Sequence, residues 1–221
     1  MVSLFAALAL AVFPLGPTEP VSDLPLRPFA ATVPSPVMAV MLSGESGWVG
    51  IDRTITQTLL NRGIPVVGFD MPAYLKTKKT PDQMGADLAR VVRFYLDSWA
   101  ADSVLLIGDA RGASALTFMA ARLPADLRSR VKLVGLLEPG LHLESMPTLP
   151  ETVRLNGLDV VCVYGRKESN MLCPELTPAA GSVIVTDGNR HLDKDYALLA
   201  DLLLERAALG VTPASGAGAM H

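Results

Sequence analysis

The segment with the clearest chemical signal is G-D-A-R-G at residues 108–112, which lies between an apolar strand predicted at residues 104–107 and a helix predicted at residues 113–122. Two glycines at this spacing, with a strand before them and a helix after them, are typical of a nucleophile elbow. This turn is so tight that side chains at the glycine positions would collide with neighbouring backbone. The central residue is normally the nucleophile, but here it is Ala110. An ordinary glycine-rich turn is the alternative interpretation.

Alanine at this position removes the nucleophile, because a methyl group cannot attack an ester and gives a base no hydroxyl to deprotonate. The neighbouring residues do not replace it. Asp109 is one residue away from the centre of the turn, and Ser114 lies one helical turn further on. We expect Asp109 and Arg111 to be surface charges. The sequence leaves open whether Ala110 is an engineered substitution or a natural feature of a non-catalytic homologue.

A second loop, L-S-G-E-S-G-W at residues 42–48, follows a strand predicted at residues 37–42. Ester-cleaving enzymes with an elbow place part of their oxyanion hole after this strand. The backbone N–H groups of Gly44 and Glu45 are therefore predicted to join that of Arg111 in stabilising a developing negative charge. The two serines of the loop are not set on a strained turn, so we do not expect them to act as nucleophiles. Alternatively, the glycines only permit a tight turn and the tryptophan only packs.

Among the three histidines, His191 is the best candidate for a general base. It lies in N-R-H-L-D after the last predicted strand, where the histidine belongs in the chain order nucleophile, acid, histidine. His142 lies in a predicted loop, and His221 is the last residue of the chain. A surface position without a catalytic role is the alternative for His191.

Glu168 is the favoured candidate for the acid that would orient this histidine. It lies in Y-G-R-K-E, just beyond a strand predicted at residues 160–164, which is a common place for such an acid. Asp187 and Asp193 compete with it. Glu168 is otherwise a solvated charge in a loop.

The elements that would hold these groups alternate along the chain between short apolar runs and amphipathic segments. The predicted strands are residues 37–42, 64–69, 104–107, 131–137, 160–164 and 182–185, and the predicted helices are residues 51–61, 81–99, 113–122 and 196–208. Thr80, Pro81 and Gln83 predict the start of the second helix, because threonine and glutamine at this spacing form a capping box. Alternation of this kind predicts an α/β fold with a mostly parallel sheet and helices on both faces. Functional groups then gather at the carboxyl ends of the strands.

Composition narrows the possible functions. The net charge of −3 and the low aromatic content argue against nucleic-acid binding. The first 15 residues are almost entirely apolar, which suits the core of a secretory signal better than a membrane span, with a buried first element as the alternative. We expect residues 1–36 to be a signal-like N-terminus and proline-rich connector, residues 37–209 the folded domain, and residues 210–221 a flexible tail. We expect no cofactor and no metal.

Cys162 and Cys173 are the only cysteines and lie on either side of Glu168. In an exported protein, an even count at this spacing predicts one disulfide. In the chain-entropy model it would contribute roughly 2 to 3 kcal/mol and would hold the loop of the acid in place. Two buried thiols in a cytosolic protein are the alternative.

Several of these stretches together resemble the VirJ/AcvB family of bacterial virulence proteins, which are α/β-hydrolase-like. The matching stretches are L-S-G-E-S-G-W, R-G-I-P-V-V-G-F-D, T-P-D-Q-M-G-A-D-L-A-R-V-V-R-F-Y, the elbow with A-A-R-L-P behind it, C-V-Y-G-R-K-E-S-N-M-L-C and N-R-H-L-D-K-D-Y. They cover roughly residues 37–207 in order. The resemblance places the family's serine at Ala110, its histidine at His191 and, most plausibly, its acid at Glu168.

The resemblance also implies a periplasmic location and, for some members, hydrolysis of the ester that links lysine or alanine to phosphatidylglycerol. With Ala110 in place, we expect this chain to bind the aminoacylated head group without turnover, in peripheral contact with membrane lipid. The alternative is a non-catalytic envelope protein that assists secretion of virulence factors through protein partners of the secretion system. A cytosolic hydrolase relative of unknown substrate is a third reading.

Overall fold

The computed structural model describes residues 20–177, 181–187 and 195–209. Its main feature is a seven-stranded sheet in the order β1-β3-β2-β4-β5-β8-β9. The strands are β1 (Leu26–Phe29), β2 (Val37–Leu42), β3 (Val66–Phe69), β4 (Ser103–Asp109), β5 (Val131–Leu137), β8 (Val160–Gly165) and β9 (Ser182–Thr186). Neighbouring strands are parallel except for β1, which pairs antiparallel with β3 at the edge. The predicted mostly parallel α/β sheet is confirmed.

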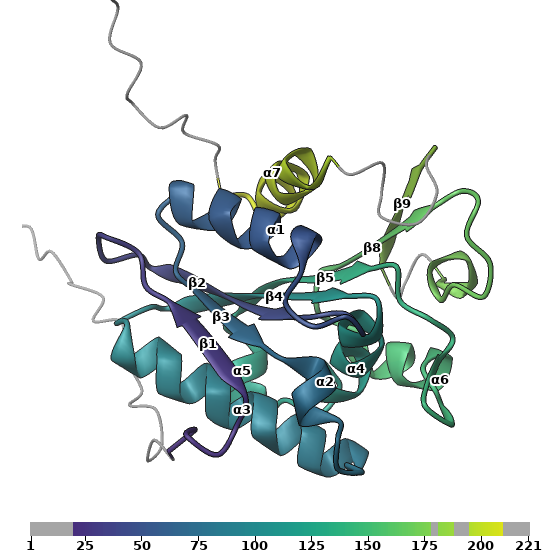
Figure 1. Ribbon diagram of the computed structural model, residues 1–221, viewed down its shortest axis with the longest axis horizontal. Helices are drawn as coiled ribbons and strands as arrows, with labels where there is room; N and C mark the ends of the chain where they lie inside the picture. The colour runs from purple at the N-terminus through teal and green to yellow at the C-terminus, as the bar shows by residue number, and fades with distance from the viewer. Residues whose placement is uncertain (1–19, 178–180, 188–194, 210–221) are drawn as a thin grey trace, which may run out of the picture.

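Helices cover both faces of this sheet (Figure 1). One face carries α1 (Gly50–Asn61) and α7 (Tyr196–Arg206), and the other carries α3 (Pro81–Ser98), α4 (Arg111–Ala120) and the short α5 (Ala125–Arg128). Successive residues of a strand point to opposite faces, so β2 contributes to two cores. Met38, Val40 and Leu42 pack in the core under α3 and α4, whereas Val37, Ala39 and Met41 pack in the core under α1 and α7. Every residue of β2 is therefore buried.

The start of α3 shows how local sequence sets an element that supports the site. Thr80 accepts a hydrogen bond from the backbone N–H of Gln83, and the Gln83 side chain accepts one from the backbone N–H of Thr80. This reciprocal capping box, with Pro81 in the first turn, confirms the predicted helix start. The helix then buries one side against α4.

Several elements were not expected from the sequence. Strand β1 lies within the stretch predicted to be a connector, and Val21 and Leu24 just before it are buried. The remaining short elements are α2 (Met71–Tyr74), the hairpin β6 (His142–Leu143) and β7 (Met146–Pro147), α6 (Leu149–Thr152), and the 3-10 turns η1 (Val153–Leu155) and η2 (Cys173–Glu175). The signal-like run and the C-terminal tail lie outside the described residues. Within the described part of the chain, no helix is both long and apolar enough to cross a membrane.

The carboxyl ends of β2, β4, β5 and β8 meet at one edge of the sheet, because these strands are parallel neighbours. The segment 108–112, the loop 42–48, and the segments after Leu137 and Gly165 all begin there. The fold therefore brings together loops that are more than 100 residues apart in the sequence.

Candidate active site

The segment 108–112 has the geometry of a nucleophile elbow. Ala110 precedes α4 with φ 45° and ψ −107°, a backbone conformation that residues with a side chain rarely adopt. A Cβ on Gly108 would lie 2.6 Å from the Ala113 Cα, and one on Gly112 would lie 2.4 Å from the Leu42 carbonyl oxygen. Both positions therefore admit only glycine. The turn is the strained strand-to-helix turn that the sequence predicted.

A cavity of about 430 Å³ opens at this turn, and we call it the elbow cavity. Its described lining consists of Gly44, Glu45, Ser46, Val49, Ile51, Asp109, Ala110, Arg111, Ser114, Glu138, Gly140, His142, Leu143, Glu144, Glu168 and Met171. Five predicted site residues are thus brought to one cavity: Gly44, Glu45, Ala110, Arg111 and Glu168. The predicted base His191 and the competing acid Asp193 lie outside the described residues.

The two predicted oxyanion-hole segments both line this cavity. Arg111 is the first residue of α4, so its backbone N–H has no acceptor within the helix. The loop 42–48 is held at both ends: Ser43 accepts a hydrogen bond from the backbone N–H of Met71 at 3.1 Å, and the Trp48 ring stacks on Phe29 of β1 at 5.5 Å between centroids. Strand β1 therefore helps to fix this loop, which gives the unexpected edge strand a role near the site.

Two of the three serines near the turn already have other hydrogen bonds. The Ser114 hydroxyl donates to the Ala110 carbonyl oxygen at 3.2 Å and accepts from the backbone N–H of Gly140 at 2.9 Å. Ser43 is fully buried and bonded to Met71. Ser46 is exposed in the loop 42–48. These contacts agree with the prediction that no neighbouring serine takes the place of a nucleophile at position 110.

The segment after β8 is tied down around Glu168. Cys162 and Cys173 form the predicted disulfide, with their Cα atoms 5.5 Å apart. The backbone N–H of Leu172 donates to the Pro139 carbonyl oxygen at 2.8 Å, so this segment is also fastened to the one that follows β5. Glu168 lines the cavity, whereas Asp187 is 91% exposed and pairs with Arg166. Asp187 therefore does not line the described part of the cavity.

The position of Asp109 contradicts its prediction. It was expected to be a surface charge, but it is buried, with only 7% of its surface exposed, and it lines the elbow cavity. Burial is the main cause that raises the pKa of its carboxyl to about 8, and the nearby carboxylates of Asp52, Glu138 and Glu45 contribute in the same direction. The charged form is disfavoured because water is excluded and like charges are close. Its flanking partner Arg111 is half-buried and forms an ion pair with Glu144.

Sequence reasoning missed three other groups at this edge. Glu138 follows β5, has φ 50° and is 9% exposed, and His142 of the hairpin lines the same cavity. Asp52 of α1 is fully buried, and its Oδ2 accepts the backbone N–H of Val49 at 3.1 Å. Burial is the main cause that raises the pKa of Asp52 to about 6. Glu138 could have been predicted at this edge, because it lies directly after a buried strand in the sequence.

The cavity is strongly acidic. Its described lining contains the carboxyl groups of Glu45, Asp109, Glu138, Glu144 and Glu168. Arg111 is the only lysine or arginine in that described lining. These carboxyl groups do not form a metal centre: within the described residues, no three side chains of histidine, cysteine, aspartate or glutamate are placed to hold an ion.

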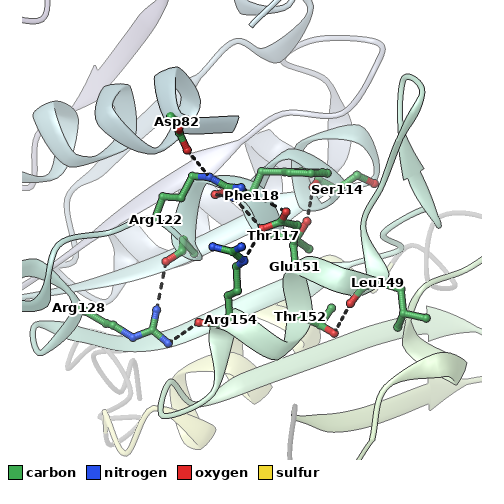
Figure 2. A network of polar contacts seen from close by, with 11 residues as sticks. Asp82, Ser114, Thr117, Phe118, Arg122, Arg128, Leu149, Glu151, Thr152 and Arg154 are labelled. Atoms are coloured by element: carbon green, nitrogen blue, oxygen red, sulfur yellow. Dashed lines mark hydrogen bonds and ion pairs between the residues drawn. The ribbon is translucent and has the colours of Figure 1, made fainter. Parts of the chain in front are cut away.

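A network of charged contacts holds α4, and so the elbow at its start (Figure 2). Arg122, just beyond α4, donates to Asp82 of α3 at 2.9 Å and makes two bonds to Glu151 of α6, at 2.7 and 3.3 Å. The side chains of Arg122 and Glu151 are only 16% and 13% exposed. The network therefore links three helices on the same face of the sheet.

The sheet order, the strained elbow and the cavity at the strand ends define a protein of the α/β-hydrolase fold, and solved structures agree. The protein Est1E of Butyrivibrio proteoclasticus with bound ferulic acid matches with a TM-score of 0.61 and 14% identity, over 86% of this chain and 98% of that chain. An esterase of Pyrococcus furiosus matches with a TM-score of 0.59 and 14% identity, over 78% and 82%. The esterase domain of a Rhodothermus marinus protein matches with a TM-score of 0.58 and 16% identity, over 80% and 88%. At these identities the likeness shows the fold alone.

Residues 36–209 match the family model described as bacterial virulence protein (VirJ). The chain therefore belongs to the VirJ family, as its sequence motifs predicted. No curated protein matches it. It is a hydrolase-fold member of a virulence protein family, and its disulfide is typical of compartments outside the reducing cytosol.

Proposed function

We propose that this chain binds aminoacylated phosphatidylglycerol in the bacterial periplasm and holds the ester in the elbow cavity without cleaving it. The observation that carries the proposal is the position of Ala110. Its backbone has the strained elbow conformation, its side chain lines the cavity, and the first N–H of α4 follows it directly. The site thus has the form of an ester-cleaving centre in which the Cβ of residue 110 lacks the attacking oxygen.

The supporting groups have defined roles in this proposal. The N–H groups of Arg111, Gly44 and Glu45 stabilise the ester oxygen, and Glu168 orients His191 as the base. With serine at position 110, His191 would take the hydroxyl proton and the serine oxygen would attack the ester carbonyl, so that phosphatidylglycerol leaves through its head-group hydroxyl with the proton from the histidine. Water, deprotonated by the same histidine, would then attack the aminoacyl-serine and release the free amino acid. With alanine, only binding and weak residual catalysis remain, because loss of the nucleophile alone costs on the order of 10⁶ in turnover.

The membrane supplies the ligand in this proposal. Phosphatidylglycerol carries its aminoacyl group on the head group, so the cavity can reach the ester from the lipid surface by peripheral contact and no membrane span is required. The disulfide supports an exported location, because such bonds persist in oxidising compartments.

The test is to place serine at position 110 (A110S) and measure release of lysine or alanine from vesicles that contain lysyl- or alanyl-phosphatidylglycerol. We expect release at least a hundredfold above that of the chain with Ala110. The matched control is Ala86→Ser on the exposed side of α3, which does not line the cavity and should give no release.

A folded A110S chain that releases no amino acid and a parent chain that does not bind these vesicles would together refute the proposal. That result would favour the second candidate, a non-catalytic envelope protein that assists secretion of virulence factors through protein partners. The observations behind this candidate are the alanine at the elbow and the membership in a family of virulence proteins.

A further inference from the structure

We propose that Asp109 is the anchor of a site in the elbow cavity for the α-ammonium group of the ligand. This inference rests on the proposed function, because it names the part of the aminoacyl ester that the cavity recognises. It also gives a role in specificity to Asp109, which is not the nucleophile, the base, the acid or part of the oxyanion hole.

The first observation is that the Asp109 side chain is buried without a hydrogen-bond or ion-pair partner among the described residues. It has 7% of its surface exposed and lines the cavity, and no residue of the described chain forms a hydrogen bond or an ion pair with its carboxylate. A buried carboxyl group without a partner is costly to the fold. A cationic ligand would supply the missing partner and would favour loss of the proton that the buried carboxyl otherwise holds, so that the carboxylate forms a charge-assisted hydrogen bond, which is stronger than a neutral one.

The second observation is the charge of the surroundings. Glu45, Glu138 and Glu168 also line the cavity, and the cationic side chain of Arg111 is paired with Glu144. This field favours a cation and disfavours an anion such as the phosphate of the lipid. The aminoacyl end of the head group therefore enters the cavity, and the phosphodiester stays outside.

The third observation is the distance between this carboxylate and the elbow. A Cβ on Gly44 would lie 2.6 Å from the Asp109 Oδ2 and 3.7 Å from the Ala110 Cβ. The carboxylate and the centre of the elbow therefore both border Gly44. In an aminoacyl ester the α-nitrogen is two bonds from the carbonyl carbon, so an ester above Ala110 places this nitrogen near Asp109. The side-chain amine of lysine is several bonds further away.

This geometry predicts selection by the α-ammonium group, whatever the amino acid. Alanyl and lysyl esters should both bind, because both carry that group. Unmodified phosphatidylglycerol should bind poorly, because it offers no cation. With alanine at position 110 only weak residual catalysis remains, so binding can be measured at equilibrium before the ester is cleaved.

The experiment compares alanyl-phosphatidylglycerol with its N-acetyl form in vesicles that otherwise contain phosphatidylcholine. We expect the parent chain to bind the alanyl form about 10 to 100 times more tightly, as for a hydrogen bond to a charged group. Asp109→Asn and Asp109→Ser should lose this preference. Asp97→Asn, which removes the same charge from an exposed position on α3, should keep it. Thermal unfolding would verify that each variant is folded.

The outcomes separate this inference from the proposed function. Equal binding of the two lipids, or a preference that survives in both folded Asp109 variants, overturns the ammonium site and leaves lipid binding intact. Binding of soluble alaninamide that depends on Asp109, without binding of any lipid, supports the ammonium site and refutes the proposed lipid ligand. Absence of binding to the lipids and to alaninamide overturns both.

Discussion

The Asp109 carboxylate lies so close to Gly44 that a Cβ on this glycine would be 2.6 Å from Oδ2. The loop 42–48 therefore closes over a buried acid that belongs to the elbow itself. Folding places this group where water is scarce and where Asp52, Glu138 and Glu45 add negative charge. The arrangement affects both stability and ligand choice, and the effect on stability can be measured without any ligand.

Stability should fall as pH rises, and Asp109 should cause part of the fall. Its pKa is about 8 in the folded chain and near 3.8 when unfolded, so between these values the folded state holds a proton that the unfolded state has lost. This lowers the free energy of unfolding by about 1.4 kcal/mol per pH unit. Asp52, with a pKa of about 6, contributes only below that pH. Asp109→Asn should therefore flatten the decline between pH 6 and 8 by about 2 kcal/mol in total.

Urea denaturation at several pH values measures this slope. Asp97→Asn, which removes an exposed charge, should keep the slope of the parent chain. If Asp109→Asn and the parent chain have parallel stability curves from pH 6 to 8, the carboxyl of Asp109 does not titrate there.

Glycine at position 110 should stabilise the fold. Ala110 has φ 45° and ψ −107°, and such strain costs on the order of 1–3 kcal/mol. Glycine relieves the strain but loses more freedom on folding, so the net gain for Ala110→Gly should be about 1 kcal/mol. Ala86→Gly, on an exposed position inside α3, should instead lose about 1 kcal/mol. Chemical denaturation of both variants checks the opposite signs, and a loss at both positions would show that the elbow is not strained.

Much of this fold can be predicted because its signals are local. Residues 37–42 are a continuous apolar run, and residues 131–137 are apolar except for Lys132; they form β2 and β5 with those bounds. The capping box at Thr80 marks the start of α3 within one residue. Strand β1 was missed because four residues with a central proline carry little strand signal and pair only through the edge of β3.

The site is less predictable, because burial of a single charge depends on distant segments. Asp109 is next to the centre of the elbow in sequence, but its surroundings come from Gly44, Asp52 and Glu138 on three other elements. No periodicity relates these positions. The elbow itself could be predicted from the sequence, because contacts within one turn and with β2 require its two glycines.

The network around Arg122 predicts different effects for its two acidic partners. Glu151 is 13% exposed and makes two bonds to Arg122, so Glu151→Ala leaves a largely buried guanidinium without its main partner. It should lower the free energy of unfolding by about 2 kcal/mol. Asp82 is 93% exposed, and Asp82→Ala should cost less than about 0.5 kcal/mol. Equal losses in urea denaturation would contradict the unequal roles that burial assigns to the two carboxylates.

The disulfide should contribute to stability through the loop that it closes. Removing both cysteines (C162A/C173A) frees a segment closed by residues 11 apart and should lower the free energy of unfolding by about 2 to 3 kcal/mol. A reducing agent should destabilise the parent chain by a similar amount and leave the double variant unchanged. If the reducing agent affects the double variant equally, its effect on the parent chain does not come from this bond.

The restored enzyme should reveal which histidine and which acid act in it. In the A110S background, His191→Ala should lower release of amino acid from alanyl-phosphatidylglycerol by about 10² to 10⁴-fold, because the base is lost. His142 also lines the cavity, and His142→Ala should lower release less than about tenfold, as for a wall residue that transfers no proton.

Glu168→Gln should cause the larger loss among the acids if Glu168 orients the histidine, and Glu138→Gln is the matched comparison because both carboxyl groups line the cavity. A dominant effect of Glu138 would move the acid from the end of β8 to the end of β5. That result is compatible with the fold, since β5 and β8 are parallel neighbours whose carboxyl ends lie at the same edge of the sheet. It would leave the proposed nucleophile position and the ammonium site unchanged, because neither depends on which strand supplies the acid.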